Sequence, residues 1–140
     1  MIETYRGVVY PHQLDHMGHM NVQWYTSKFD EATWHWFSYL GITNDYIQAN
    51  QRGMAALEQL TKYKSEVMVG DLLRVTTTMI EVKPKTMRFL HTMYDAARGE
   101  VVSTSELVGV HLDRVQRKGC EFPAEIEKRC EAALASKPSD

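Results

Sequence analysis

The sequence of 140 residues has few cysteines, a small net charge and no long apolar run. The two cysteines, Cys120 and Cys130, follow no secretory signal, so we expect free thiols rather than a disulfide. The formal net charge is -2, with acidic and basic residues interspersed. This balance argues against a nucleic-acid-binding surface and against a polybasic membrane anchor.

No stretch approaches the length of a membrane-spanning helix, and the opening residues MIETYRGVVYPHQ lack the apolar core of a signal peptide. We therefore expect a cytoplasmic protein with neither a membrane nor a nucleic-acid partner. Hydrophobic residues make up 44% and charged residues 24% of the chain, as in ordinary globular proteins. The length is that of one domain, so residues 1–140 are expected to fold as a single unit around one core.

The first forty residues predict a strand, a loop and a long helix. Residues 2–10 are rich in β-branched and aromatic side chains, and residues 11–21 contain the turn formers Pro11 and Gly18. Asn21 is a favourable N-cap. Behind it, apolar residues recur at the three- and four-residue steps of one helical face. These are Val22, Tyr25, Phe29, Ala32, Trp36, Phe37 and Leu40, with Gly41 placed to end the helix and with Trp24 and Trp34 off the stripe. Aromatic residues on more than one side predict a helix that is enclosed.

The rest of the chain predicts a short helix, four strands and a C-terminal helix. The short helix covers residues 43–50 with Thr43 as its cap. The strands cover residues 54–69, 72–82, 86–95 and 100–112, and the last helix covers 123–134 with Pro123 at its first position. Because short turns permit only antiparallel pairing, we expect an α+β fold with one antiparallel sheet curled round the long helix.

The stretch DHMGHMN at residues 15–21 gathers unusual chemistry in seven positions. Side chains of the types that bind metals occur close together: His12, Asp15, His16 and His19. The H-x3-H spacing forms a metal site when a helix brings both histidines to one face. Pro11 and Gly18 argue against such a helix, so no metal site is expected. Besides being a possible metal ligand, Asp15 can be interpreted as a carboxylate that stabilises a turn or the entry to a helix.

Residues 9–25, VYPHQLDHMGHMNVQWY, resemble the hotdog-fold acyl-CoA thioesterases, most closely the 4-hydroxybenzoyl-CoA thioesterase branch. The later segments LEQLTKY at 57–63, VGDLLRV at 69–75, Ser105-Glu106, HLD at 111–113 and Phe122-Pro123 extend the resemblance over about residues 5 to 125. The variant GHMN at 18–21, together with Glu58, Glu106 and HLD, looks most like thioesterases linked with betaine and carnitine metabolism.

The resemblance implies a long helix wrapped by a curved antiparallel sheet, and two copies paired edge to edge with the acyl-CoA site between them. It implies hydrolysis of a short- or medium-chain, or small polar or aromatic, acyl-CoA. No cofactor is expected, since coenzyme A belongs to the substrate. Unpaired edge strands also favour a homodimer, or a tetramer built from two dimers.

Asp15 matches the family's catalytic carboxylate, which activates a water molecule or attacks the thioester itself. The N–H of Val22, at the predicted helix start, is the expected oxyanion donor. Gly18 is expected to allow a close approach or a positive φ. Glu58 is a second candidate for the catalytic acid, because related thioesterases draw a carboxylate from another element.

Three further residues near the motif are assigned to substrate binding, each with a structural alternative. His19 either polarises the substrate or organises the loop. Asn21 is expected to cap the helix rather than to catalyse. Tyr25 either packs in the core or contacts the substrate through its hydroxyl.

The CoA phosphates require basic residues, and we assign them to Lys83, Lys85 and Arg88, with Lys62 and Lys64 as alternatives. Glu106 is expected to be held in a hydrogen bond or ion pair. The rings of Trp24, Tyr25, Trp34 and Trp36 either hold an aromatic or quaternary ammonium acyl group or only pack the helix.

Two other functions are compatible with the same scaffold. A hydratase or dehydratase would act on the acyl chain and leave the thioester intact. A non-catalytic module would bind acyl-CoA without turning it over.

Overall fold

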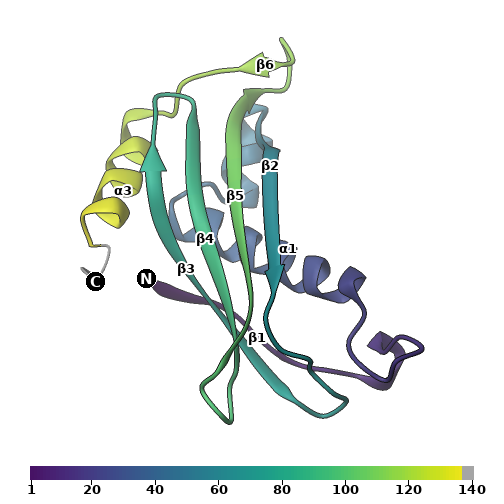
Figure 1. Cartoon of the computed structure of the whole chain (residues 1–140). Helices are drawn as coiled ribbons and strands as arrows, with labels where there is room; N and C mark the ends of the chain where they lie inside the picture. The colour runs from purple at the N-terminus through teal and green to yellow at the C-terminus, as the bar shows by residue number, and fades with distance from the viewer. Residues whose placement is uncertain (137–140) are drawn as a thin grey trace.

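The computed structural model describes residues 1–136, in which one curved antiparallel sheet wraps the long helix α1 (Val22–Tyr39) (Figure 1). The strands are β1 (Ile2–Val8), β2 (Arg52–Tyr63), β3 (Leu72–Val82), β4 (Thr86–Asp95), β5 (Val101–Asp113) and β6 (Lys118–Gly119). Their order across the sheet is β1-β3-β4-β5-β2, with β6 beside β5. The predicted α+β hotdog architecture is confirmed, and the two-residue strand β6 is an element that the sequence did not predict.

Helix α1 begins and ends where local chemistry predicts. The side chain of Asn21 accepts a hydrogen bond from the backbone N–H of Gln23 at 2.9 Å, as an N-cap does. The chain leaves the helix at Gly41, whose φ of +94° favours glycine. The predicted stripe is buried at Tyr25, Phe29, Ala32, Trp36 and Leu40. The prediction of an enclosed helix is wrong for a single chain, because Trp34 is 55% exposed on the other side.

The short connections largely follow the predictions. Strand β1 ends two residues earlier than expected, and a 3-10 turn covers Pro11–Gln13. Helix α2 (Asn44–Asn50) is capped by Thr43, whose hydroxyl accepts the N–H of Tyr46 at 3.1 Å. Pro123 is the N-cap of α3 (Ala124–Ala135) rather than its first helical residue. None of the helices in residues 1–136 is long and apolar enough to cross a membrane.

Strand β2 is shorter than predicted, because the chain leaves the sheet after Tyr63. The N–H groups of Lys64 and Ser65 both donate to one carbonyl, that of Val102, which ends the regular pairing. Val67 is fully buried, but it lies in a loop whose carbonyl accepts the N–H of Met20. The alternation over residues 64–69 therefore reflects packing against the loop before α1, not a strand.

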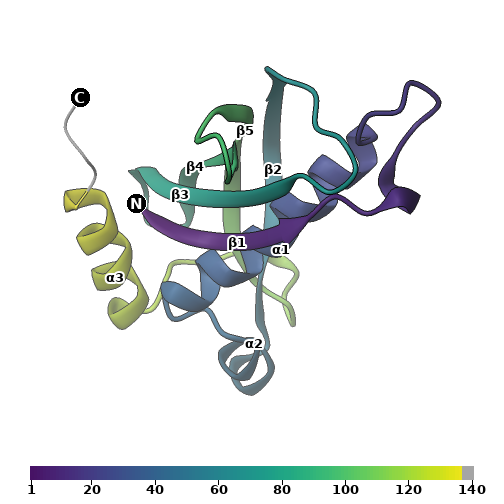
Figure 2. The ribbon, with the colours of Figure 1, turned by 90° about the horizontal axis from the view of Figure 1, so that it is seen from below.

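Two apolar clusters fill the space between α1 and the sheet. One lies beneath the first half of α1 and contains Val9, Met20, Tyr25, Phe29, Ala32, Val67, Leu73, Val75, Met93 and Val102. The other lies beneath the second half and reaches α3; it contains Trp36, Leu40, Ile42, Met79, Met87, Phe89, Leu107, Phe122, Ile126, Cys130 and Ala133. Figure 2 shows α3 beside β3, at the end of the sheet away from the loop that precedes α1. Both cysteines are free thiols, as predicted.

A chain of polar side chains crosses this core from β1 to α1. The hydroxyl of Thr4 lies 2.8 Å from that of Thr77, which lies 2.7 Å from Nδ1 of His91. Nε2 of His91 lies 2.8 Å from the hydroxyl of Thr33 on α1, and that hydroxyl donates to the carbonyl of Phe29. His91 is fully buried, and burial lowers its pKa to about 3, so the ring is neutral.

Candidate functional site

The loop before α1 folds into a compact turn around Asp15. The N–H of Gly18 donates to the carbonyl of Asp15 at 3.1 Å, and the N–H of Asp15 donates to the carbonyl of His19 at 2.8 Å. Gly18 has a φ of +80°, as the sequence predicted. Oδ1 of Asp15 accepts the N–H of Met17 at 2.8 Å. The carboxylate is therefore held in one orientation by its own turn.

Three contacts fix this turn to the rest of the molecule. The N–H of Met20 donates to Val67 at 2.9 Å, and the N–H of Asn21 donates to the carbonyl of Gln13 at 2.8 Å. Nε2 of His19 lies 3.1 Å from the carboxylate of Glu66, in the segment that follows β2. This geometry favours the interpretation of His19 as a loop organiser. Glu66 was missed from the sequence, because its partner is 47 positions away and no local pattern marks it.

Asp15 and the start of α1 together form a site that suits acyl transfer. Asp15 is half-buried, and within residues 1–136 no group donates a hydrogen bond to its Oδ2. Val22 is the first residue of α1 and is 56% exposed. Its N–H has no acceptor within the helix and carries the positive end of the helix dipole. Acyl transfer uses groups of both kinds, because a carboxylate can activate a nucleophile and an N–H at a helix start can stabilise an oxyanion.

Tyr25 lies one turn into α1 and connects the helix to the segment after β2. Its hydroxyl donates to the carbonyl of Ser65 at 3.4 Å, and its ring meets Tyr63 edge-on at 5.1 Å. Burial, reinforced by the nearby Tyr63, Glu66 and Asp15, raises the pKa of Tyr25 to about 12. The phenol is therefore protonated at neutral pH and is engaged in packing the site.

Glu58 lies apart from this site, on the outer face of the sheet. Its carboxylate is 3.5 Å from the guanidinium of Arg88, which also binds Glu106 at 2.8 Å. The side chain of Glu58 is 67% exposed. Within one protomer the structure does not bring Glu58 to Asp15. The expected ion-paired role of Glu106 is confirmed, and its partner is one of the predicted CoA-binding residues.

Lys83 and Lys85 occupy the turn between β3 and β4, at the top of Figure 1, whereas the loop of Asp15 lies at the lower right. Lys83 is exposed and lies 3.6 Å from the carboxylate of Glu81. Within one protomer, the three predicted CoA contacts are thus at the opposite end of the sheet from the predicted catalytic acid.

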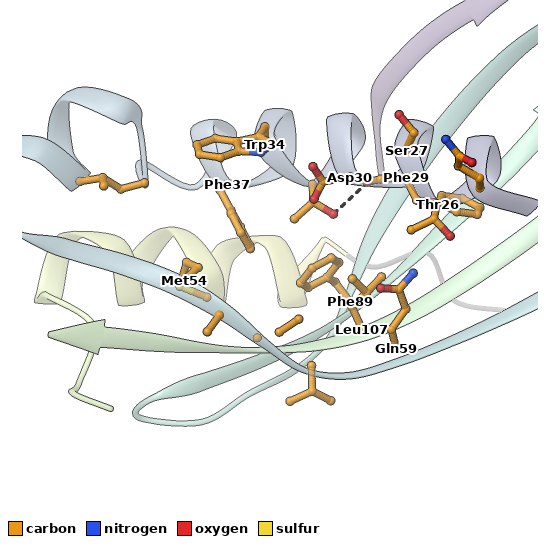
Figure 3. Close-up of a pocket in the computed structure, with 17 residues that line it drawn as sticks. Thr26, Ser27, Phe29, Asp30, Trp34, Phe37, Met54, Gln59, Phe89 and Leu107 are labelled. Carbon is orange, nitrogen blue, oxygen red and sulfur yellow. Dashed lines mark hydrogen bonds between the residues drawn. The ribbon is translucent and has the colours of Figure 1, made fainter. Parts of the chain in front are cut away.

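A pocket of about 480 Å³ lies between α1 and strands β2 and β5 (Figure 3). Its helix side begins in the first turn of α1 and continues along one face of the helix. The lining residues are Gln23, Thr26, Ser27, Phe29, Asp30, Thr33, Trp34, Phe37, Ile47, Met54, Ala55, Ala56, Gln59, Phe89, Leu107, Val108 and Gly109. Asp15 and Val22 are not among them. The face of α1 that carries Gln23, Thr26, Asp30 and Thr33 could not be recognised from the sequence, because its polar residues do not form an apolar stripe.

The four aromatic residues considered for the acyl group do not converge. Trp36 is buried in the core, 5.8 Å from the ring of Tyr39. Trp24 packs edge-on against His12 at 5.2 Å, away from the pocket, while Trp34 lines the pocket. Tyr25 faces the segment after β2. A cage made of all four rings is therefore wrong within one protomer.

No three His, Cys, Asp or Glu side chains within residues 1–136 are arranged to hold a metal ion. Of the metal-ligand candidates, His19 pairs with Glu66, His12 packs on Trp24, and His16 is exposed.

Comparison with known proteins places this geometry in a family. The model of the thioesterase-like superfamily matches residues 9–130. The chain belongs to the thioesterase-like superfamily. The resemblance to the thioesterases that the sequence indicated is confirmed with it.

The relatives of this superfamily member include two curated bacterial proteins. The L-carnitine dehydrogenase/betainyl-CoA thioesterase of Rhizobium meliloti is 26% identical over 81% of the chain, which spans only 23% of that protein's length. The betainyl-CoA thioesterase of Pseudomonas aeruginosa is 24% identical over 94% of the chain and 83% of its own length. Among solved structures, a hypothetical protein of Staphylococcus aureus in complex with CoA matches with a TM-score of 0.92 and 21% identity. That match covers 100% of this chain and 90% of the other.

Proposed function

We propose that the protein hydrolyses an acyl-CoA thioester to a carboxylic acid and free CoA, with Asp15 as the catalytic carboxylate. The observation that carries this proposal is the position of Asp15 in the turn that leads into α1. One carboxylate oxygen accepts the N–H of Met17, and within residues 1–136 no group donates to the other; Val22, the first residue of α1 and 56% exposed, lies seven positions further on. The names of the relatives, both thioesterases acting on an acyl-CoA, support the same reaction.

In the proposed reaction, the thioester carbonyl oxygen accepts a hydrogen bond from the N–H of Val22. As general base, Asp15 takes a proton from a water molecule whose oxygen attacks the carbonyl carbon, and the negative charge gathers on the carbonyl oxygen. The C–S bond then breaks, and the thiolate of CoA leaves and takes up the proton. As nucleophile, Asp15 would form a mixed anhydride that water hydrolyses to the same products. In the proposed site, His19 and Tyr25 hold the walls, and Asn21 fixes the helix start.

The proposed substrate carries a short- or medium-chain, or small polar or aromatic, acyl group. The printed names of the two curated relatives make betainyl-CoA the first thioester to test. In a single chain, the surroundings of Glu58 favour an ion-paired role over catalysis, because the carboxylate shares Arg88 with Glu106.

We further propose that two copies pair along β2. Strand β2 has 12 residues and lies at the end of the strand order, so its outer edge has no strand beside it within residues 1–136. Leu57 and Leu60 on this strand are each 59% exposed. Unpaired edges with exposed apolar side chains favour association.

A two-fold axis at this edge would reverse the partner's sheet. The partner's turn between β3 and β4 would then lie at the same end of the joined sheet as the Asp15 loop. In this arrangement Lys83 and Lys85 of one copy approach the CoA phosphates bound at the other copy. Arg88 is the weakest of the three candidates, because two carboxylates already hold its guanidinium.

The proposal is tested by Asp15→Asn in a thiol-release assay over a panel of acyl-CoAs. Asparagine keeps the oxygen that accepts the N–H of Met17, so the turn should be retained. We expect kcat to fall at least about 10²-fold, the scale of general-base catalysis. Asp45→Asn, on the exposed start of α2, is the matched control and should retain the wild-type rate.

Three outcomes would contradict parts of this proposal. Unchanged activity in Asp15→Asn removes the catalytic assignment of Asp15. Tight binding without thiol release from any thioester would indicate a non-catalytic module. A product that retains the thioester would indicate a hydratase or dehydratase.

A further inference from the structure

Asp30 is the one charged residue among those that line the pocket between α1 and strands β2 and β5 (Figure 3). It is exposed, and within residues 1–136 its carboxylate makes neither an ion pair nor a side-chain hydrogen bond. The other polar members of the lining are uncharged hydroxyls and amides. The pocket therefore has a net negative charge and no basic group to balance it.

Aromatic residues line the same pocket as this carboxylate. Trp34 lies four positions after Asp30, on the same helical face, and Phe37 lies a further turn along. Phe89 projects from β4 and meets the ring of Phe37 edge-on at 5.8 Å. Figure 3 shows Trp34 and Phe37 on the helix side of the pocket and Phe89 on the sheet side. Aromatic faces next to a carboxylate attract a cation, particularly one with apolar substituents.

We propose that this pocket receives the acyl group of the substrate and that the acyl group carries a fixed positive charge, with Asp30 as the specificity-determining residue. This inference rests on the proposed thioesterase function. The pocket begins at Gln23, in the same turn of α1 as the oxyanion donor Val22. A neutral or anionic acyl group would desolvate the carboxylate of Asp30 without compensating its charge, whereas a quaternary ammonium group would neutralise it.

The pocket has a volume of about 480 Å³ and accommodates trimethylammonium acyl groups of different lengths. In a betainyl group the nitrogen is two bonds from the carbonyl carbon, and in a 4-(trimethylammonio)butyryl group it is four bonds away. Pairing along β2 would cover the open side of the pocket and strengthen the attraction by excluding water.

The experiment compares cationic thioesters with neutral isosteres of the same shape. The pairs are betainyl-CoA with 3,3-dimethylbutyryl-CoA, and 4-(trimethylammonio)butyryl-CoA with 5,5-dimethylhexanoyl-CoA. The measured quantity is the ratio of kcat/KM, cation over isostere, for each length. We expect the wild-type ratio to exceed one for at least one of the two lengths.

Asp30→Asn should lower each ratio that exceeds one in the wild type at least tenfold. Trp34→Leu should lower the same ratio about two- to fivefold, the scale of a partly exposed cation–π contact. Glu31→Gln is the matched control, because it removes the same charge from the adjacent position of α1 outside this pocket. It should change the ratio less than twofold.

The results distinguish this inference from the function on which it rests. If no thioester releases CoA thiol, the proposed function fails and the inference fails with it. If the thioesters are hydrolysed but Asp30→Asn leaves both ratios unchanged, only the inference fails. If Asp30→Asn dissociates the dimer in light scattering without altering the ratios, Asp30 is a subunit contact, and the inference is also overturned.

Discussion

Replacing His91 by glutamine should flatten the dependence of the free energy of unfolding on pH. The ring is fully buried between Thr33 and Thr77, and burial lowers its pKa to about 3. The hydroxyl of Thr33 donates to the carbonyl of Phe29, so it accepts from Nε2–H of His91. Nδ1 is then the acceptor of the Thr77 hydroxyl. A proton added to Nδ1 would face that donor in a site without solvent.

The magnitude follows from the difference in pKa between the folded and unfolded chain. The unfolded ring has a pKa near 6.5, so its stabilising contribution is complete above that pH and is lost as the pH falls toward 3. Between these values the unfolded chain binds one more proton, which costs about 1.4 kcal/mol per pH unit. From pH 6.5 to pH 4.5 this amounts to about 2.3 kcal/mol, because the unfolded ring is already half protonated at pH 6.5. That is a large share of the stability of a small domain.

The assay is urea unfolding of both proteins at pH 6.5, 5.5 and 4.5, at one fixed protein concentration because association affects apparent stability. Glutamine keeps one donor and one acceptor but has no group that titrates in this range. Other groups, including His111 with its lowered pKa, are common to both proteins and cancel in the difference. If the free energy of unfolding falls equally with pH in the wild type and in His91→Gln, the buried neutral ring is not the source of the acid sensitivity.

Two further predictions concern the ends of the sheet. Gly7→Ala on β1 should destabilise the fold by about 1–3 kcal/mol in urea unfolding, because a Cβ at that position would overlap the ring of Tyr5. A variant as stable as the wild type would contradict this overlap. Leu57→Lys combined with Leu60→Lys should convert a dimer into a monomer in light scattering, whereas Leu72→Lys, on an equally exposed leucine of β3, should not. An intact dimer in the double variant would exclude pairing along β2.

The fold could be predicted wherever local chemistry sets the boundary. Strands β3 and β4 begin and end at the predicted residues, because Gly70-Asp71 and Lys83-Pro84-Lys85 mark the turns on both sides. The N-cap Asn21 was predictable for the same reason. The end of β2 was not, because Val67 is buried by a loop about fifty positions earlier in the chain.

The candidate site could likewise be predicted only in part from the sequence. The motif around Asp15 is continuous in sequence, so its turn, its cap and its family resemblance could be found without coordinates. The pairing of His19 with Glu66 and the position of Glu58 on the outer face depend on contacts between distant segments. Asp30 was missed because its importance comes from the opposite wall of the pocket, which β2 and β5 supply.

The two ends of the sheet differ in a way that limits how the molecule can associate. Strand β1 is short and pairs with residues 72–77 of β3, and Lys28 of α1 donates to the carbonyl of Val8 near its end. Cys130 and Ile126 of α3 pack with Met79 in the part of β3 that β1 leaves unpaired. Strand β2 is left as the one long open edge in the described part of the chain. If two copies pair along β2 as proposed, growth of the sheet by edge addition stops at the dimer, because each copy has then used the long edge that residues 1–136 offer.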